Sequence, residues 1–262
     1  MPNGLDKLTE GLGKAIETVP ELYKDAFQPA VQETGKFIAR IPHAINAAFS
    51  GLDKWILNKE YSIDETKKLL AQKLENIEPE KIVEPEPYVA IPALQAISYS
   101  MNSDELRNLY ANLLAKSMNA DTKDSVHPSF VEIIKQLSPI DSLVFKKIME
   151  RETNPLVNLI YEDEKGSFIT LATNVSDIPL FAPEVVSISV DNLVKQSLIH
   201  IPADEYYINN KIYEPILNSN YYRVQQELHP STTNGYKFTH QKRKIDKTNL
   251  GRLFYKICVV DL

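Results

Sequence analysis

Cysteine is almost absent from this sequence of 262 residues, in which Cys258 is the only one. A single cysteine excludes an intrachain disulfide, and its scarcity is typical of proteins that fold in a reducing compartment. The thiol lies between Ile257 and Val259. We therefore expect it to be a small buried apolar group rather than a reactive one.

Long apolar runs are also lacking. Nowhere do about 18 apolar residues follow one another, the length that a membrane-spanning helix needs. The opening segment, MPNGLDKLTEGLGK, has neither the basic region nor the apolar region of a secretory signal. The sequence therefore predicts a cytoplasmic protein without a membrane span.

The motifs of catalysis, metal binding and phosphate binding are missing too. Residues 11–15, GLGKA, lack the spacing and the hydroxyl of a phosphate loop. The five histidines are scattered, with no His-Glu-x-x-His pair and no dense set of nitrogen and sulfur ligands. No Gly-x-Ser-x-Gly elbow occurs, although a serine nucleophile assembled from distant segments is left open. We expect no enzyme, and no cofactor or metal.

Charge is distributed unevenly. The net charge of −6 disfavours non-specific attraction of the whole protein to nucleic acid or anionic lipid. Between Tyr236 and Lys256, however, seven basic residues stand against one acidic residue. This segment predicts either a solvated hairpin or a patch for nucleic-acid phosphates or an acidic protein surface. The candidate binding residues are Lys242, Arg243, Lys244 and Lys247.

Residues 1–60 predict short amphipathic helices that pack on the rest of the protein. Apolar residues recur at helical spacing over 31–41 and again over 45–56, and Pro29 and Pro42 separate these stretches. An alternative function for residues 31–56 is membrane activity, although their excess of positive charge is small.

Residues 61–137 predict a central helical domain. Ser62 and Glu65 have the spacing of a capping box, and the helix that they start should run to about Ile77. Alternating prolines predict an extended connector over 84–87. A short apolar helix is expected near residues 91–99.

The strongest helical pattern comes next, with Asn102 as its predicted cap. Its expected buried face comprises Leu106, Leu109, Tyr110, Leu113 and Leu114. A polar loop over 121–126 leads to another helix, in which Pro128 fits the first turn. We expect His127 to be a local cap or to contact solvent rather than to act as a general acid or base.

Residues 138–262 predict a second domain. Ser138 and Pro139 should open one helix, and Pro183 another. Strands are expected over 198–201, 206–208 and 236–245, before a final helix over 250–257.

This order of two helices, strands and a terminal helix predicts a winged-helix-like α+β unit. The second helix of such a unit enters the DNA major groove. Here that helix offers only Lys195 and Gln196 as long DNA-contacting side chains, which is poor chemistry for gripping phosphates. The whole chain is therefore predicted to be mainly α with a small β component.

Several segments resemble a known family. Residues 81–100 read KIVEPEPYVAIPALQAISYS, and residues 104–145 read DELRNLYANLLAKSMNADTKDSVHPSFVEIIKQLSPIDSLVF. These segments, with LYKDAFQPAVQETGK upstream, resemble the bacterial abortive-infection alpha family. In the tail, the family's threonine–glycine–phenylalanine–cysteine pattern is matched, with Lys247 where leucine is usual. The matching residues are Thr248, Gly251, Phe254 and Cys258.

The resemblance implies a role in bacterial defence against phage, in which infected cells arrest or die, and it carries over no catalytic residue. Asn108 and Asn112 lie four residues apart in the matching helix, so we expect them to share a face and to bind the adjoining loop. The leading hypothesis is a non-enzymatic binding or sensor protein with a protein partner.

The sequence leaves two alternative functions open. One is a nucleic-acid-binding regulator that acts through residues 138–262, and the other is a membrane-active toxin that acts through residues 31–56. A homo-oligomer is left open as well, because core and interface stripes look alike in a single sequence.

Overall fold

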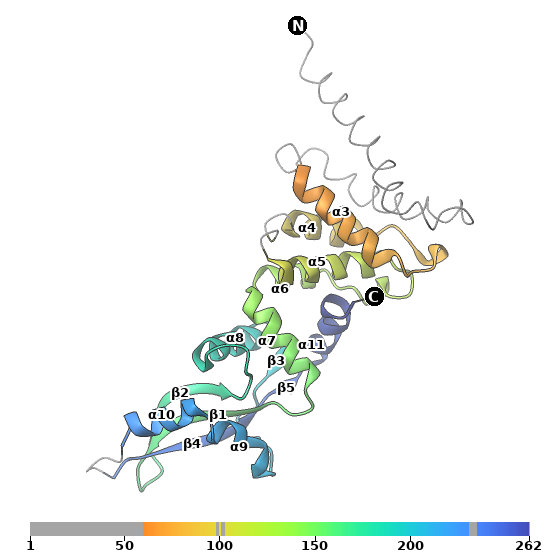
Figure 1. Cartoon of the computed structure of the whole chain (residues 1–262). Helices are drawn as coiled ribbons and strands as arrows, with labels where there is room; N and C mark the ends of the chain where they lie inside the picture. Colours follow the sequence, from red (N-terminus) through yellow and green to blue (C-terminus); the bar gives the residue numbers. More distant parts are fainter. Residues whose placement is uncertain (1–59, 98–99, 101–102, 231–234, 262) are drawn as a thin grey trace.

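The computed structural model describes residues 60–97, 100, 103–230 and 235–261 (Figure 1). These residues form a mainly helical fold with a small antiparallel sheet, as the sequence predicts. The short helices expected before residue 60, including the segment 31–56, lie outside the described residues. Among the helices of the described part, none is long and apolar enough to cross a membrane.

The first part of the fold is a set of helices around a central one. They are α3 (Glu60–Leu74), α4 (Pro87–Ile97), α5 (Asp104–Ser117) and α6 (Ser129–Lys135), with 3₁₀ turns η3 (Pro79–Lys81) and η4 (Lys123–Ser125) between them. Helices α3, α4 and α6 all contact α5. The predicted face of α5 is confirmed, because Leu109, Tyr110, Leu113 and Leu114 are buried and Leu106 is partly buried.

The starts of three of these helices differ from the prediction. The cap of α5 is Ser103, whose hydroxyl accepts a hydrogen bond from the backbone N–H of Leu106 at 3.3 Å. Ser62 lies within α3, so it is not an N-cap. Helix α4 begins at Pro87 and not near residue 91, because proline lacks the N–H that a first helical turn leaves unpaired.

Helices α7 (Pro139–Glu150) and α8 (Pro183–Lys195) begin where the sequence predicts. The Ser138 hydroxyl accepts from the N–H of Asp141 at 3.1 Å, and the Asp141 carboxylate accepts from the N–H of Ser138 at 2.7 Å. This reciprocal capping box satisfies two backbone donors that the helix start leaves unpaired. Local sequence is therefore sufficient to position these starts.

A three-stranded antiparallel sheet holds two strands that the sequence analysis missed. Its order is β2-β1-β4, from β1 (Pro155–Glu162), β2 (Phe168–Ser176) and β4 (Lys237–Lys244). Only β4 was expected. Strand β1 reads as a nearly continuous apolar run because its residues are buried on both faces of the sheet, so it shows no alternating pattern.

Helices cover both faces of this sheet (Figure 1). The predicted polar excursion contains η5 (Asn210–Tyr213), α9 (Glu214–Leu217) and α10 (Asn220–Leu228). Val157 and Leu159 pack with Tyr213 and Ile216 from these elements. Helix α8 contacts β2 and places Val186, Val190 and Leu193 in the larger core cluster.

A second, two-stranded sheet pairs β3 (Ile199–His200) with β5 (Asp246–Lys247). The strand predicted over 206–208 is wrong. Side-chain hydrogen bonds hold this segment instead: the Tyr207 hydroxyl accepts from the N–H of Asn154 at 3.0 Å, and the N–H of Tyr207 donates to the Tyr213 hydroxyl at 2.9 Å.

The winged-helix detail is not confirmed, since the β1–β2 hairpin lies between α7 and α8. The domain boundary at residues 137/138 stays a prediction, and one buried cluster contains both Phe130 and Phe145 from its two sides. The terminal helix α11 (Asn249–Phe254) continues as a π-helical turn, η6 (Tyr255–Val259), which contacts α5.

Candidate functional site

The tail from Thr248 onward runs back to the helical body and holds the threonine–glycine–phenylalanine–cysteine pattern (Figure 1). Thr248 caps α11, because its hydroxyl accepts from the N–H of Gly251 at 2.8 Å and donates to the carbonyl of Ser197 at 2.7 Å. A Cβ at Gly251 would lie 1.9 Å from the carbonyl oxygen of Leu198. Both residues therefore seat the first turn of α11 tightly on the turn between α8 and β3.

The other two pattern residues are buried in the core. The Phe254 ring lies edge-on to Phe130 of α6 and Phe145 of α7, with centroid distances of 5.4 and 5.6 Å. Burial raises the pKa of the Cys258 thiol well above its usual range. Cys258 is therefore a neutral apolar group, as the sequence predicts.

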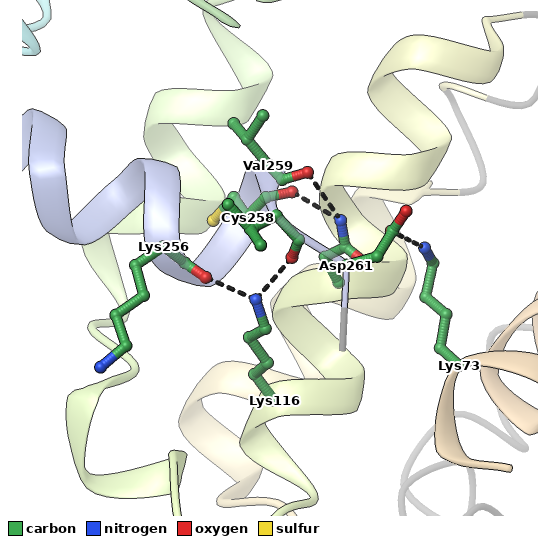
Figure 2. Close-up of polar contacts among 8 residues, drawn as sticks. Lys73, Lys116, Lys256, Cys258, Val259 and Asp261 are labelled. Carbon is green, nitrogen blue, oxygen red and sulfur yellow. Dashed lines mark hydrogen bonds and ion pairs between the residues drawn. The ribbon is translucent and has the colours of Figure 1, made fainter. Parts of the chain in front are cut away.

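Polar side chains of α5 hold the end of the tail (Figure 2). The Asn112 amide donates to the carbonyls of Cys258 at 3.0 Å and Val259 at 3.4 Å. The Lys116 ammonium donates to the carbonyls of Lys256 and Val260. A helix end leaves such carbonyls without intrahelical partners, so these side chains take the place of a cap.

A salt bridge adds a third attachment. Lys73 of α3 meets the Asp261 carboxylate at 2.7 Å (Figure 2), and this hydrogen bond lowers the pKa of Asp261. The C-terminal clamp consists of Lys73, Asn112 and Lys116 together with residues 256–261. The clamp ties α3, α5 and the end of the described chain into one unit.

The clamp places polar groups inside the protein. Asn112 is 1% exposed and Lys116 is 4% exposed. Burial lowers the pKa of Lys116, and the side-chain oxygen of Asn112 is buried without a partner. Both features cost free energy, so the clamp is less stable than apolar packing of the same size would be.

Only part of this site could be predicted from the sequence. Asn112 was expected to bind the adjoining loop, but it binds carbonyls about 146 residues further along the chain. Asn108 is exposed. Lys116 was missed altogether, because a lysine on a helix gives no local sign that a distant tail covers it.

The predicted basic patch is spread over β4 and β5, and its lysines have partners within the protein. Lys242 donates to the Asn210 side chain at 2.7 Å. Lys244 lies 2.6 Å from the carboxylate of Glu205 and 3.2 Å from that of Asp246.

The side chains of Arg243 and Lys247 lie apart from those of Lys242 and Lys244. Successive strand residues point to opposite faces, so Arg243 lies on the other side of the sheet from its two neighbours, and its Nε is buried without a partner. Lys247 donates to the carbonyls of Met149 at 2.9 Å and Arg151 at 2.6 Å at the end of α7. This contact gives the lysine a structural role at the position where leucine is usual. A phosphate-binding role for the four residues stays a prediction.

The histidines and acidic residues of the described part form no metal site. His127 is a local cap, as predicted, since its Nδ1 accepts from the N–H of Ser129 at 3.1 Å. Within residues 60–97, 100, 103–230 and 235–261, no group of three His, Cys, Asp or Glu side chains could hold a metal ion.

Comparison with known proteins identifies the family. Residues 58–258 match the family model described as abortive infection alpha. The matched range contains Asn112 and Lys116 of the clamp and all four residues of the tail pattern. No curated protein and no solved structure matches the chain. The chain therefore belongs to the abortive infection alpha family, which indicates a role in abortive infection, a defence against phage.

Proposed function

We propose that this protein is a non-enzymatic sensor of phage infection, which binds a protein partner and responds by releasing its C-terminal clamp. The observation that carries the proposal is the buried Lys116 ammonium, which holds the tail through backbone carbonyls. A buried ammonium whose hydrogen bonds go to carbonyls and not to a carboxylate is a costly way to fix a tail. Such a contact suits an element that has to open.

We expect the closed clamp and the released tail to be similar in free energy. When the tail is in place, Lys116 loses its hydration, and burial lowers its pKa accordingly. When the tail leaves, the ammonium returns to water and the Asn112 oxygen gains a hydrogen-bond donor from solvent. A partner that binds the released form more tightly would shift the population towards it.

The tail pattern supports a conformational role rather than a chemical one. Thr248 and Gly251 fix the base of α11, while the clamp holds the other end. The pattern's two nucleophile types are both occupied, because the Thr248 hydroxyl caps the helix and the Cys258 thiol is buried and neutral. Release of residues 256–261 would therefore expose a surface of α5 while the base of α11 stayed seated.

A defence assay with matched lysine variants tests this function. Lys116→Met keeps the approximate length of the side chain but leaves the carbonyls of Lys256 and Val260 without their donor. The clamp should therefore loosen, and the arrest response should appear without infection, as slower growth of uninfected cells. Lys146→Met serves as the control, since that lysine is half-exposed on α7, and it should protect like the wild type. Thermal unfolding of each variant confirms that it folds.

Capture of the tagged protein from infected and uninfected bacteria tests the partner. We expect a protein that copurifies only after infection, and in larger amount with Lys116→Met, because the loosened clamp populates the released form that the partner binds. Equal plaque counts on cells with and without the protein would overturn the defence role, and wild-type growth of uninfected cells together with wild-type protection by Lys116→Met would overturn the clamp mechanism. Nucleic acid in both samples, lost with Lys242→Glu, would favour the regulator instead.

A further inference from the structure

The outer side of β2 is a free strand edge over its first half. Among the described residues, β2 pairs only with β1, so its other side has no partner strand (Figure 1). Phe168 is 50% exposed, Ile169 is 59% exposed, and Thr170 is also exposed. Consecutive residues point to opposite faces, so both faces of the sheet are open here.

The second half of the same edge is covered. The Ser187 hydroxyl of α8 donates to the carbonyl of Thr173 at 2.9 Å. Asn174 has a positive φ of 54°, which bends the strand, and its amide donates to Asp191 at 2.7 Å. The free edge is therefore confined to residues 168–172.

Helix α8 adds an apolar side chain beside this edge. Residues three and four apart share a helix face, and Ser187 and Asp191 both contact β2. Ile188, three residues before Asp191, is 69% exposed. Phe168 and Ile169 of β2 and Ile188 of α8 are thus large apolar side chains exposed to water.

The two edge strands of the sheet differ in charge. Strand β4 carries four basic residues, whereas β2 carries no charged residue and no proline in its nine residues, FITLATNVS. Charges and prolines on an edge strand oppose pairing with another chain. Strand β2 lacks this protection, and the segment that fits it is itself uncharged, extended and apolar. Of the two edge strands, only β2 has that composition.

We infer that β2 of one copy pairs antiparallel with β2 of a second copy, which makes one continuous sheet across a dimer. A twofold axis at Thr170 would set Phe168 opposite Ala172 and Ile169 opposite Leu171 of the partner copy. The pairing uses the whole free edge and ends where α8 covers it. This inference is independent of the clamp and of the proposed function.

A charge on the edge tests the dimer. Ile169→Lys should convert a dimer into a monomer, which halves the mass measured by light scattering. Ile208→Lys is the matched control, since Ile208 is 93% exposed on a loop outside the sheet, and it should stay dimeric. Circular dichroism of both variants confirms that the fold is kept.

A single engineered cysteine tests the register. Thr170→Cys should give a disulfide-linked dimer under mild oxidation, and Ile169→Lys in the same chain should abolish it. The native Cys258 is buried, so the wild type should show no cross-link. Wild-type protein that stays monomeric at all concentrations, an Ile169→Lys variant that stays dimeric, or a dimer that Thr170→Cys does not cross-link overturns the inference.

Discussion

Two regions of this protein differ in how they bury their apolar residues. The helical body comprises α3 to α7 with α11 and η6, and the sheet unit comprises β1, β2 and β4 with α8, η5, α9 and α10. In the helical body, α5 and α7 pack against η6, and even the end of the tail is held by buried side chains. In the sheet unit, β1, β2 and β4 share a small second cluster with η5 and α9. Large apolar side chains remain exposed in the sheet unit and on its helices α8 and α10: Phe168, Ile169, Ile188, Val224 and Leu228. The body buries, wholly or in part, most of the apolar residues of the tail, whereas more of the large apolar side chains of the sheet unit are exposed.

Truncating one buried ring in each region should show the largest difference. Phe254→Ala removes a fully buried ring that joins α6, α7 and α11, and it should lower the free energy of unfolding by about 3–5 kcal/mol. Phe238→Ala removes a partly buried ring beside Tyr222 and should cost less than about 2 kcal/mol. Urea unfolding measures both, and equal losses would break the comparison.

Adding one methyl group at a glycine of each region should give the next largest effect. Gly251→Ala places a Cβ against the backbone of Leu198, and overpacking of this kind should cost about 3 kcal/mol. Gly166→Ala meets no atom within 4 Å but keeps a φ of +80°, which should cost about 1 kcal/mol. A Gly251→Ala variant with wild-type stability would show that α11 is not tightly seated.

Helix caps offer a smaller contrast. Thr248→Ala removes both the cap of α11 and the hydroxyl that donates to Ser197, so it should cost about 1–2 kcal/mol. Ser219→Ala removes only the cap of α10 and should cost about 0.5–1 kcal/mol. Thermal unfolding at one pH measures the two losses, and the reverse order would contradict the tighter attachment of the tail.

Acid should weaken the sheet unit before the body. Burial and the nearby Lys242 charge lower the pKa of His240 from 6.5, and its ring hydrogen bonds with the Tyr222 hydroxyl at 2.9 Å. Between pH 6.5 and the lowered pKa, the folded state binds fewer protons than the unfolded state. The free energy of unfolding therefore falls as the pH falls through this window. The protection of the α10 amides against hydrogen exchange should fall in this window, and His240→Gln should remove the change.

Much of the helical body could be predicted because its signals are local. Ser138 and Pro139 start α7 where expected, and the buried face of α5 follows from the spacing of Leu109 and Leu113. The sheet was harder, since β1 is buried on both faces and its apolar run resembles a buried helix as much as a strand. The clamp could not be found, because Lys116 meets its partners only through the folded chain.

The sequence by itself determined the family, the mainly helical class and the starts of α7 and α8, because capping residues and apolar spacing act over a few residues. The tertiary structure decided which polar residues matter together. It brought Lys116 to a tail 140 residues away, divided the basic residues of β4 between two faces, and left one edge of β2 uncovered. These features depend on contacts between distant segments, which leave no periodic pattern in either partner.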